Sequence, residues 1–506
     1  MPDTVPTIQP DPTPIPIDRD PPDLRLVPAL LAIVAVKLLI LVADASPRFF
    51  LWDSVTYLQG AIGGPLPRDR SFLYSLLIEA IAVPLHSLHA LVFTQTLAGV
   101  VSALLAYLIL RRHLSVRFGV ALAAALLFAL EPSQLFYERM VMAEAIGGML
   151  WLVFIALALE YVRSGRSLWL PLVAFAGIVA VSVRLNGTPV IVLVSLSLPL
   201  LRLVLTPRAR RAQPLERRRL LLQLALASAC TLVFHAGYRQ VVAQVAHTQP
   251  GYIGTEGLFM LGYVAPAVEP KDFRATGCDP DVLTRVDRPL GDSRTREYQL
   301  WGEGGLWAVM QRDCANAEAV ADKVARRAFA RIAPWVLPMA VATNAQYFDY
   351  AESIWRMNSD LGRKGMLPLE LIEAAQKYFS FDVRPVAFTN TFTSIWFEHS
   401  RWWLTACFLL APVVAIWFAR RMRHGIHATE ARLLALILIG LFLTQFLLSP
   451  VIAFRYLHPF PPLLIVSAAA ILVSYLRQAN ARLRDAESGA YVSKTGFRVP
   501  PAAAPE

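Results

Sequence analysis

The sequence predicts an all-α polytopic membrane protein, and two observations support this prediction. Of the 506 residues, 56% are hydrophobic and only 17% are charged, and the mean hydropathy is +0.48. A soluble globular chain has about 25% charged residues. The apolar residues also gather in blocks of about 17–23, the length at which a helix crosses a hydrocarbon core of roughly 30 Å. The composition excludes a disordered chain and, because membrane topology explains the basic charge, a nucleic-acid-binding protein.

We expect about ten membrane-spanning helices. The first apolar block, Leu24 to Ala43, lacks a small-residue cleavage site and should remain as an anchor. The later blocks are 90–110, 117–131, 144–162, 168–183, 188–205, 220–238, 402–419, 433–449 and 461–476. The segment 72–86 is apolar but short, and it contains Glu79 and Pro84. These features favour a juxtamembrane helix over a membrane span.

The distribution of basic residues predicts the orientation. If 72–86 does not cross, the short connections on one side of the membrane hold 19 basic residues and those on the other side hold six. The positive-inside bias assigns the richer side, with both termini, to the cytoplasm. If 72–86 crossed, Arg111, Arg112 and Arg117 would move outside and the bias would fail. We therefore predict a multi-pass protein of the cytoplasmic (inner) membrane.

This topology divides the chain into five regions. They are a disordered proline-rich cytoplasmic tail, 1–24; an N-terminal transmembrane module, 25–239, with an external loop at 45–89; an extracytoplasmic domain, 240–400; C-terminal transmembrane helices, 401–477; and a cytoplasmic tail, 478–506. Inside the extracytoplasmic domain, 316–332 and 366–379 have helical spacing of apolar residues. Cys278 and Cys314 lie there too, in a compartment that permits a disulfide, and two free thiols are the alternative.

Asp53 is the first candidate functional residue. It follows Trp52 just outside the first predicted span. A carboxylate beside aromatic rings in a partly dry interface can have a raised pKa and serve as a general base toward a hydroxyl. Asp53 can also be the N-cap of a helix over 54–63, and the two interpretations are compatible.

A second group of acids lies in the predicted loop between the third and fourth spans, in the segment 131–144, EPSQLFYERMVMAE. The simplest interpretation of Glu131 is a solvated loop acid, and that of Glu138 is an ion pair with Arg139 or another neighbour. Glu144 stands at the start of a span, where the helix dipole favours a negative charge. Together with Asp53 it could orient an acceptor, hold a divalent cation through oxygen ligands, or tune the base.

Basic residues on the same predicted face suit a phosphate. Arg68 and Arg70 come just before the juxtamembrane helix, Arg184 closes the fifth span, and Arg455 lies in an apolar segment before the last span. A guanidinium group matches phosphate oxygens and keeps its charge at any working pH. The alternative is that these side chains snorkel toward lipid headgroups. His458 is expected to add a donor or to cap its loop, and not to bind a metal.

These residues, in this order, resemble the membrane glycosyltransferases of the GT-C fold, in the branch that contains protein O-mannosyltransferases and lipid A aminoarabinose transferases. The resemblance covers about 25–205 and the segment 454–461, FRYLHPFP. It implies a GT-C-like transmembrane bundle with juxtamembrane helices and one large external loop domain.

The resemblance also implies roles for individual residues. In that family a catalytic acid follows the first span, which matches Asp53 with Tyr57 one helical turn later, and a second acid matches Glu144 in the segment 137–144. A basic residue before a juxtamembrane helix contacts the lipid phosphate, and Arg68 or Arg70 occupies the similar place. The Arg-Tyr pair near the last span of that family resembles the pair at 455–456. The Glu138, Arg184, Tyr456 and His458 side chains are the remaining candidates for substrate binding.

Two departures from the family pattern stand out. The Lys-Pro-Pro or His-Pro-Pro element usual before the juxtamembrane helix is replaced by 67–71, PRDRS. A paired Asp-X-Asp or Asp-Glu is absent at Asp53, which argues against a tightly bound metal; whether the reaction needs a divalent cation is left open.

The implied reaction is transfer of a sugar, with inversion, from a polyprenyl-phosphate-linked donor to a glycan, lipid or protein acceptor at the outer, periplasmic face of the membrane. Asp53 would accept the proton of the acceptor hydroxyl, and Arg455 with Arg68 or Arg70 would stabilise the departing phosphate. A transporter or lipid flippase is the alternative from another class, although repeated halves and broken spans are not visible in the sequence. A non-catalytic assembly subunit is a third, and it predicts that Asp53 tolerates replacement.

Overall fold

The computed structural model describes residues 25–185, 187–206, 217–292, 296–363, 367–423 and 425–495, so the predicted tail 1–24 lies outside the described residues. Across these ranges the regular structure is helical, and the β-type pairing is one isolated bridge between Arg48 and Met140. The prediction of an all-α membrane bundle is confirmed.

The ten predicted blocks all fold as helices. They are α1 (Leu26–Ala43), α4 (Leu88–Leu108, continued by the π-helical turn Ile109–His113), α5 (Phe118–Ala129), α7 (Glu144–Ser164), α8 (Trp169–Val183), α9 (Thr188–Leu205), α10 (Arg217–Ala246), α20 (Arg401–Arg421), α21 (Ala428–Leu448) and α22 (Phe460–Thr495). Eight are long and apolar enough to cross a membrane. The exceptions, α5 and α8, have 12 and 15 residues, fewer than the roughly 20 that a full span requires. The α22 helix also continues well beyond the predicted boundary at 477.

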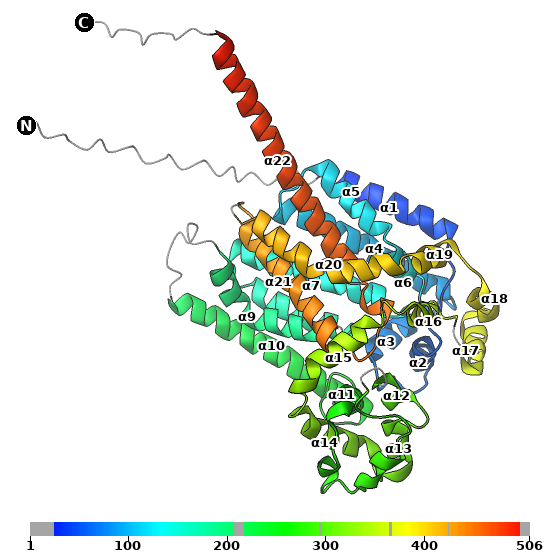
Figure 1. Ribbon diagram of the computed structural model, residues 1–506. Coiled ribbons are helices and arrows are strands. Elements are labelled where there is room, and N and C mark those ends of the chain that lie inside the picture. Colours follow the sequence, from blue (N-terminus) through cyan, green and yellow to red (C-terminus); the bar gives the residue numbers. More distant parts are fainter. Residues whose placement is uncertain are drawn as a thin grey trace, which may run out of the picture.

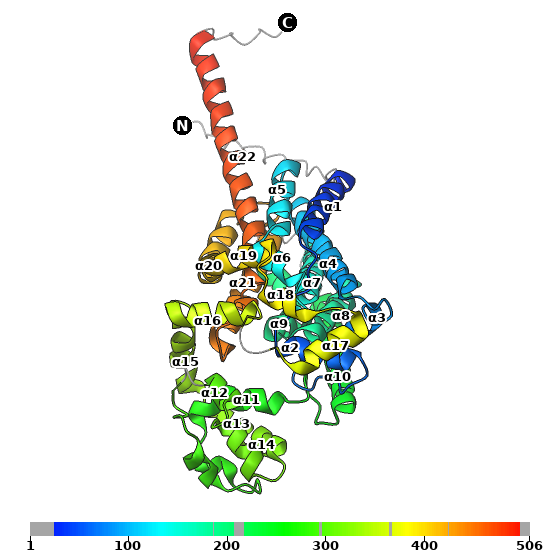
Figure 2. The same cartoon turned by 90° about the vertical axis from the view of Figure 1, so that its right-hand side faces the viewer.

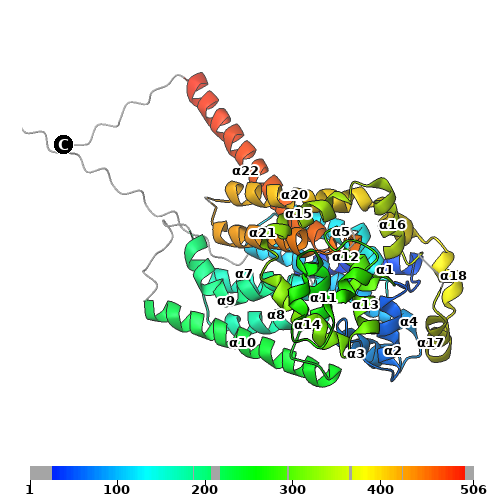
Figure 3. The ribbon, with the colours of Figure 1, turned by 60° about the horizontal axis from the view of Figure 1, so that its bottom comes forward.

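The helices pack as a bundle whose two ends differ (Figures 1 and 2). The α7 helix packs between α4 and α8, α10 packs against α8 and α9, and α20 packs against α21 and α22. The second half of α22 extends from one end, and α11–α14 lie at the other. Figure 3 shows α9 and α10 on one flank, and α17 and α18 on the opposite flank.

A buried ion pair joins α1 to the loop before α7. Lys37, in the middle of α1, is fully buried, and its Nζ lies 2.5 Å from Glu138 Oε1. Glu138 also accepts from Gln134 Nε2 at 2.8 Å and from Arg139 Nη1 at 3.0 Å. The carboxylate fits because Gly99 of α4 has no side chain: a Cβ atom there would overlap Glu138 Oε1. A lysine in lipid is costly unless it is paired, so this contact fixes how α1 docks.

The short helices before α7 lie outside the candidate spans. They are α2 (Asp53–Ala61), α3 (Phe72–Ile81) and α6 (Pro132–Tyr137). With only 10 residues, α3 is too short to cross, in keeping with the predicted juxtamembrane helix.

The predicted extracytoplasmic domain folds around a core of its own. Its elements are α11 (Glu256–Val264), the 3-10 turns Ala265–Ala267, Pro270–Phe273 and Pro280–Arg285, α12 (Arg296–Trp301), α13 (Leu306–Asp313) and α14 (Ala317–Phe329). The apolar faces of α11, α13 and α14 meet, with Leu261, Met310 and Val324 almost fully buried. Five helices then return to the bundle: α15 (Ala333–Ala345), α16 (Tyr350–Asp360), α17 (Leu369–Phe379), α18 (Val383–Phe388) and α19 (Phe392–His399). The predicted helices at 316–332 and 366–379 correspond to α14 and α17.

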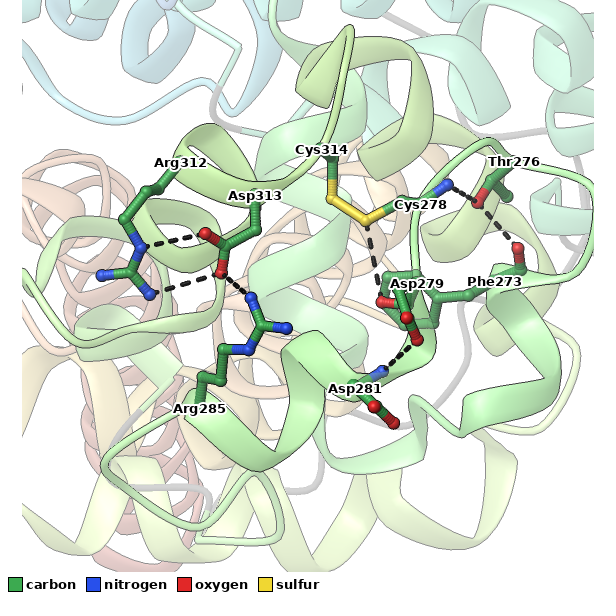
Figure 4. Close-up of a disulfide and its surroundings, with 9 residues drawn as sticks. All are labelled: Phe273, Thr276, Cys278, Asp279, Asp281, Arg285, Arg312, Asp313 and Cys314. Atoms are coloured by element: carbon green, nitrogen blue, oxygen red, sulfur yellow. Dashed lines mark hydrogen bonds and ion pairs between the residues drawn. A yellow bond between two sulfur atoms is a disulfide. The ribbon is translucent and has the colours of Figure 1, made fainter.

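Cys278 and Cys314 form a disulfide, which resolves the two interpretations left open above (Figure 4). The bond closes a loop between residues 36 positions apart, with their Cα atoms 5.0 Å apart. Next to it, the Asp313 carboxylate accepts hydrogen bonds from Arg285 Nη1 at 2.8 Å and from Arg312 Nε at 3.0 Å. The disulfide and these ion pairs tie the 3-10 turn Pro280–Arg285 to the end of α13.

Candidate active site

The Asp53 carboxylate lies between two arginines that come from distant parts of the chain. Its Oδ1 is 2.5 Å from Arg70 Nη1, in the loop before α3. Its Oδ2 accepts from Arg455 Nη1 at 2.8 Å, across 402 residues of sequence. Asp53 is the first residue of α2, and neither it nor Trp52 at the N-cap makes a side-chain cap. The predicted capping role of Asp53 is therefore wrong, because both oxygens face guanidinium groups.

The charge state of Asp53 also differs from the prediction. Burial alone would raise the pKa of this carboxyl, but Arg455 and Arg70 outweigh burial and lower the pKa below its usual value. Asp53 is therefore ionised at neutral pH, and the raised pKa expected from its aromatic surroundings is wrong for this state of the protein.

The loop that follows α1 is held against the loop that precedes α7. The Val141 amide donates to the Arg48 carbonyl at 2.7 Å, and the Arg48 amide donates to the Arg139 carbonyl at 2.7 Å. Ser54, next to Asp53, donates its hydroxyl to the Val141 carbonyl at 2.9 Å. These bonds set the start of α2 beside the start of α7, where Glu144 lies.

Glu144 joins the same group through Arg184. Arg184 Nη1 lies 2.8 Å from Glu144 Oε1, and Arg184 Nη2 donates to the Arg455 carbonyl at 3.0 Å. The close approach needs Gly147, where an added Cβ atom would lie 3.1 Å from Arg184 Cβ. Asp53, Arg70, Arg455, Arg184 and Glu144 thus form one connected set of side chains, which we call the Asp53 cluster. Both Glu144 and Arg184 are more buried than Asp53, whose side chain keeps 19% of its surface exposed.

Aromatic rings surround the two arginines of Asp53. The Arg455 guanidinium carbon lies 4.4 Å from the Phe50 ring centroid and 5.2 Å from that of Tyr456. Arg70 lies 5.8 Å from the Tyr57 centroid, and burial raises the pKa of the Tyr57 phenol. The Tyr57 hydroxyl therefore stays protonated, and cation–π contacts fix the planes of both guanidinium groups.

Asp360, at the end of α16, supports Arg455 from behind and was not identified from the sequence. Its Oδ2 accepts the backbone amides of Phe454 at 2.7 Å and Arg455 at 3.2 Å. The residue is 3% exposed, and burial raises its pKa to about 6 despite the opposing effect of Arg455. A single acid within a long external domain carries no sequence signal, because its partners are backbone amides 94 and 95 residues away.

The raised pKa of Asp360 predicts a pH-dependent stability. Between about pH 4 and pH 6 the folded protein holds this proton more tightly than the unfolded chain, so the free energy of unfolding should fall as the pH rises through that window. The difference between the two pKa values corresponds to about 3 kcal/mol. Thermal unfolding in detergent should show a steeper fall for the wild type than for Asp360→Asn, and parallel pH profiles would contradict the assignment.

Arg68 and Arg70, which the sequence left as alternatives, occupy different environments. Arg70 contacts Asp53 and also pairs with Asp69, with its Nε 3.0 Å from Oδ1. Arg68 points away and pairs with Glu318 of α14 at 2.8 Å, where both side chains are more than 40% exposed. Its carbonyl also accepts from the Thr255 amide at 3.1 Å. Arg68 therefore attaches the α11–α14 unit to the loop and does not contact Asp53.

Three further residues that the sequence singled out do not contact Asp53. They are Glu131 and Glu138, which precede α7, and His458, which precedes α22. Glu138 is ion-paired with Lys37 and Arg139, in agreement with the simpler interpretation given above. His458 is buried, lies 3.0 Å from Gln134 Oε1 through its Nε2, and has a pKa lowered to about 3 by burial. Glu131 is 3% exposed and accepts from the Gln134 amide at 2.8 Å, so the expectation of a solvated acid is wrong.

The donor atoms of the Asp53 cluster do not suit a divalent cation. Both Asp53 oxygens face arginines, and Glu144 is paired with Arg184. Across the part of the chain that the structure describes, three or more His, Cys, Asp or Glu side chains do not gather in a group that could hold a metal ion. The positive charge of three guanidinium groups opposes a cation here.

A narrow apolar cleft opens next to Glu144 and Arg184. It lies between α7, α21 and α22, and its remaining walls include Trp151, Leu441 and Leu463. His458 and Gln134 line its polar side.

The sequence matches no family model and no curated protein. Among solved structures, the chain is similar to the crystal structure of ArnT from Cupriavidus metallidurans bound to undecaprenyl phosphate. The TM-score is 0.34 at 13% sequence identity, and the alignment covers 87% of this chain and 78% of that one. A likeness this weak does not by itself assign an activity.

Proposed function

We propose that the protein is a membrane glycosyltransferase that moves a sugar from a polyprenyl-phosphate-linked donor to an acceptor hydroxyl at the outer face of the cytoplasmic membrane. The observation that supports this proposal is the Asp53 carboxylate held between Arg70 and Arg455 beside the Arg184–Glu144 pair. One base and several phosphate-binding groups are the parts that a displacement at an anomeric carbon requires.

The arginines supply the phosphate site. A guanidinium fork binds phosphate and carboxylate oxygens in the same way, so the Asp53 carboxylate occupies positions that a donor phosphate can take. As the bond from the anomeric carbon to the phosphate oxygen breaks, its electron pair passes to that oxygen. The phosphate thereby gains a further negative charge. Arg70 and Arg455 stabilise that charge as it develops.

Donor binding also makes Asp53 a better base. While both arginines face Asp53 its pKa is low, and a weakly basic carboxylate accepts a proton poorly. When the phosphate draws the guanidinium groups to itself, the carboxylate loses this stabilisation and its pKa rises. Asp53 then takes the proton of the acceptor hydroxyl while the hydroxyl oxygen bonds to the anomeric carbon, and the configuration inverts. No step uses a metal ion.

The surroundings of the cluster suit a lipid-linked donor. The apolar cleft between α7, α21 and α22 starts at Glu144 and Arg184, and we assign this side of the cluster to the first part of the polyprenyl chain. The α11–α14 unit is attached through Arg68 and Glu318 to the loop that carries Arg70. In this proposal the α11–α14 unit covers the site and selects the acceptor, and Glu144 and Tyr57 orient the acceptor.

The two neighbouring arginines provide a matched pair of variants. Arg70→Gln should lower the rate of sugar transfer about 100-fold, because it removes a donor aimed at the phosphate. Arg68→Gln removes the same charge two residues away but only an exposed ion pair, so transfer should stay within about twofold. Initial rates over a range of donor concentrations measure both variants, and equal losses would contradict the assigned positions.

The function itself is tested with the purified full chain, labelled polyprenyl-phosphate sugars and membrane extracts that supply acceptors. We expect transfer from at least one donor and a product with inverted anomeric configuration, detected by nuclear magnetic resonance. A folded protein, verified by cooperative thermal unfolding, that transfers no sugar across a broad donor panel would contradict the proposal. Movement of the same lipids across reconstituted vesicles would then support the flippase alternative.

A further inference from the structure

A second charged site lies at the other end of the bundle. A pocket of about 580 Å³ opens between the end of α20, the turn after it and the middle of α22. Four arginines line it, Arg420, Arg421, Arg423 and Arg477. From the start of α22 at Phe460 to Arg477 the helix rises about 26 Å, so this α20–α22 pocket is separated from the Asp53 cluster by most of a membrane thickness.

The four arginines lack an acidic partner within the described part of the chain. Among the residues that the structure describes, none of them forms an ion pair with Asp or Glu, whereas Arg112 and Arg163 share Glu160 at 3.0 and 2.6 Å. Four like charges around one cavity repel each other, and an anion removes that repulsion. The absence of a carboxylate partner therefore points to an anion from outside the chain.

Arg421 is pre-oriented for such an anion. Its Nη2 donates to the Ser474 carbonyl at 3.1 Å, and its guanidinium carbon lies 4.0 Å from the Tyr475 ring centroid. Its Nε is buried and has no hydrogen-bond partner. Arg477 is held in a similar way, because its Nη2 donates to the Ser115 carbonyl. Side chains fixed by carbonyls and a ring lose little entropy when they bind a ligand.

We infer that the α20–α22 pocket binds a phosphate-bearing anion through these arginines. Guanidinium forks recognise phosphate oxygens, a chemistry that a phospholipid headgroup and a soluble phosphate share. The surroundings favour the headgroup: Trp417, Leu472 and Leu476 beside the pocket are 45–51% exposed, and such side chains contact acyl chains. Basic pockets between membrane helices on the cytoplasmic side bind anionic lipids. The inference does not depend on the proposed transferase activity.

The test uses the full chain in a neutral detergent and native mass spectrometry. The protein is titrated separately with phosphatidylglycerol, with phosphatidylcholine and with inorganic pyrophosphate. The site variant is Arg420→Gln/Arg421→Gln. The matched control is Arg166→Gln/Arg218→Gln, which removes two exposed arginines from the same predicted side of the membrane. We expect the site variant, which lacks two arginines, to bind phosphatidylglycerol about 25-fold more weakly, since each basic residue near anionic lipid contributes a factor of about five. The control should bind it like the wild type.

The arms distinguish the two sources of phosphate. If the site variant, but not the control, loses binding of phosphatidylglycerol, the pocket is a lipid site. If the site variant loses only the binding of pyrophosphate, the same pocket takes a soluble ligand. Equal binding by the site variant and the control for both ligands would overturn the inference. Arg421→Lys keeps the charge and should weaken binding partially, because an ammonium group lacks the planar fork. Thermal unfolding without added lipid verifies that each variant is folded.

Discussion

The Asp53→Asn variant is expected to transfer sugar about 1,000-fold more slowly than the wild type, within the range that a general base contributes. The amide is nearly isosteric but cannot accept the proton of the acceptor hydroxyl. It also leaves Arg70 and Arg455 without the carboxylate that both contact. Single-turnover transfer at saturating donor isolates the chemical step from donor binding.

Asp69→Asn is the matched control for this substitution. Asp69 contacts the same Arg70 but does not touch Asp53 or Arg455 in the structure, so its loss should lower transfer by less than about tenfold. Equal transfer by Asp53→Asn and the wild type would remove the proposed base and favour the non-catalytic assembly subunit. A variant that fails to unfold cooperatively is compared instead through Asp53→Glu, which keeps the base and should retain part of the activity.

Lys37→Met should cause the largest loss of stability, about 3–5 kcal/mol in the free energy of unfolding. The substitution leaves the fully buried Glu138 with Arg139 as its remaining charged partner. Loss of one of its two cationic partners is costly for a buried carboxylate, because water is absent there. Denaturant-induced unfolding in detergent, followed by circular dichroism, measures the loss.

Two further variants separate the lost ion pair from a packing defect. Glu138→Gln removes the carboxylate that Lys37 and the buried Arg139 share, so it should destabilise the protein at least as much as Lys37→Met. Gly99→Ala changes no charge, but its new methyl group would displace the Glu138 carboxylate, so it should destabilise the protein as well. If Glu138→Gln and Gly99→Ala were both neutral, the ion pair would not be what fixes α1.

The sequence predicts the membrane helices well because their signal is local. The length of an apolar run decides whether it can span the membrane. The same comparison identifies α3, with 10 residues, as a helix that is too short to cross. Length is ambiguous for α5 and α8, because their apolar blocks, 117–131 and 168–183, are already short and fold as helices of 12 and 15 residues.

The candidate site is less predictable because its contacts are not local. Chemistry identifies the residue types, an acid beside a span and arginines on the same face, but it does not tell Arg68 from Arg70. That difference depends on α14, whose Glu318 draws one of the two away. Asp360 leaves no pattern at all, since it binds backbone amides. Lys37 is different, because it is a charged residue inside an apolar block. Such a residue is expected to have a buried partner.

The position of Arg455 has a consequence for biosynthesis. Asp53 enters the membrane with α1, yet its second guanidinium partner is 402 residues further along the chain, after α20 and α21. A nascent chain therefore lacks this second guanidinium group through most of its synthesis, and the Asp53 cluster is complete only when the last helical hairpin has docked. If the proposed function holds, a chain that ends before that hairpin is expected to be inactive, however well its earlier helices are inserted.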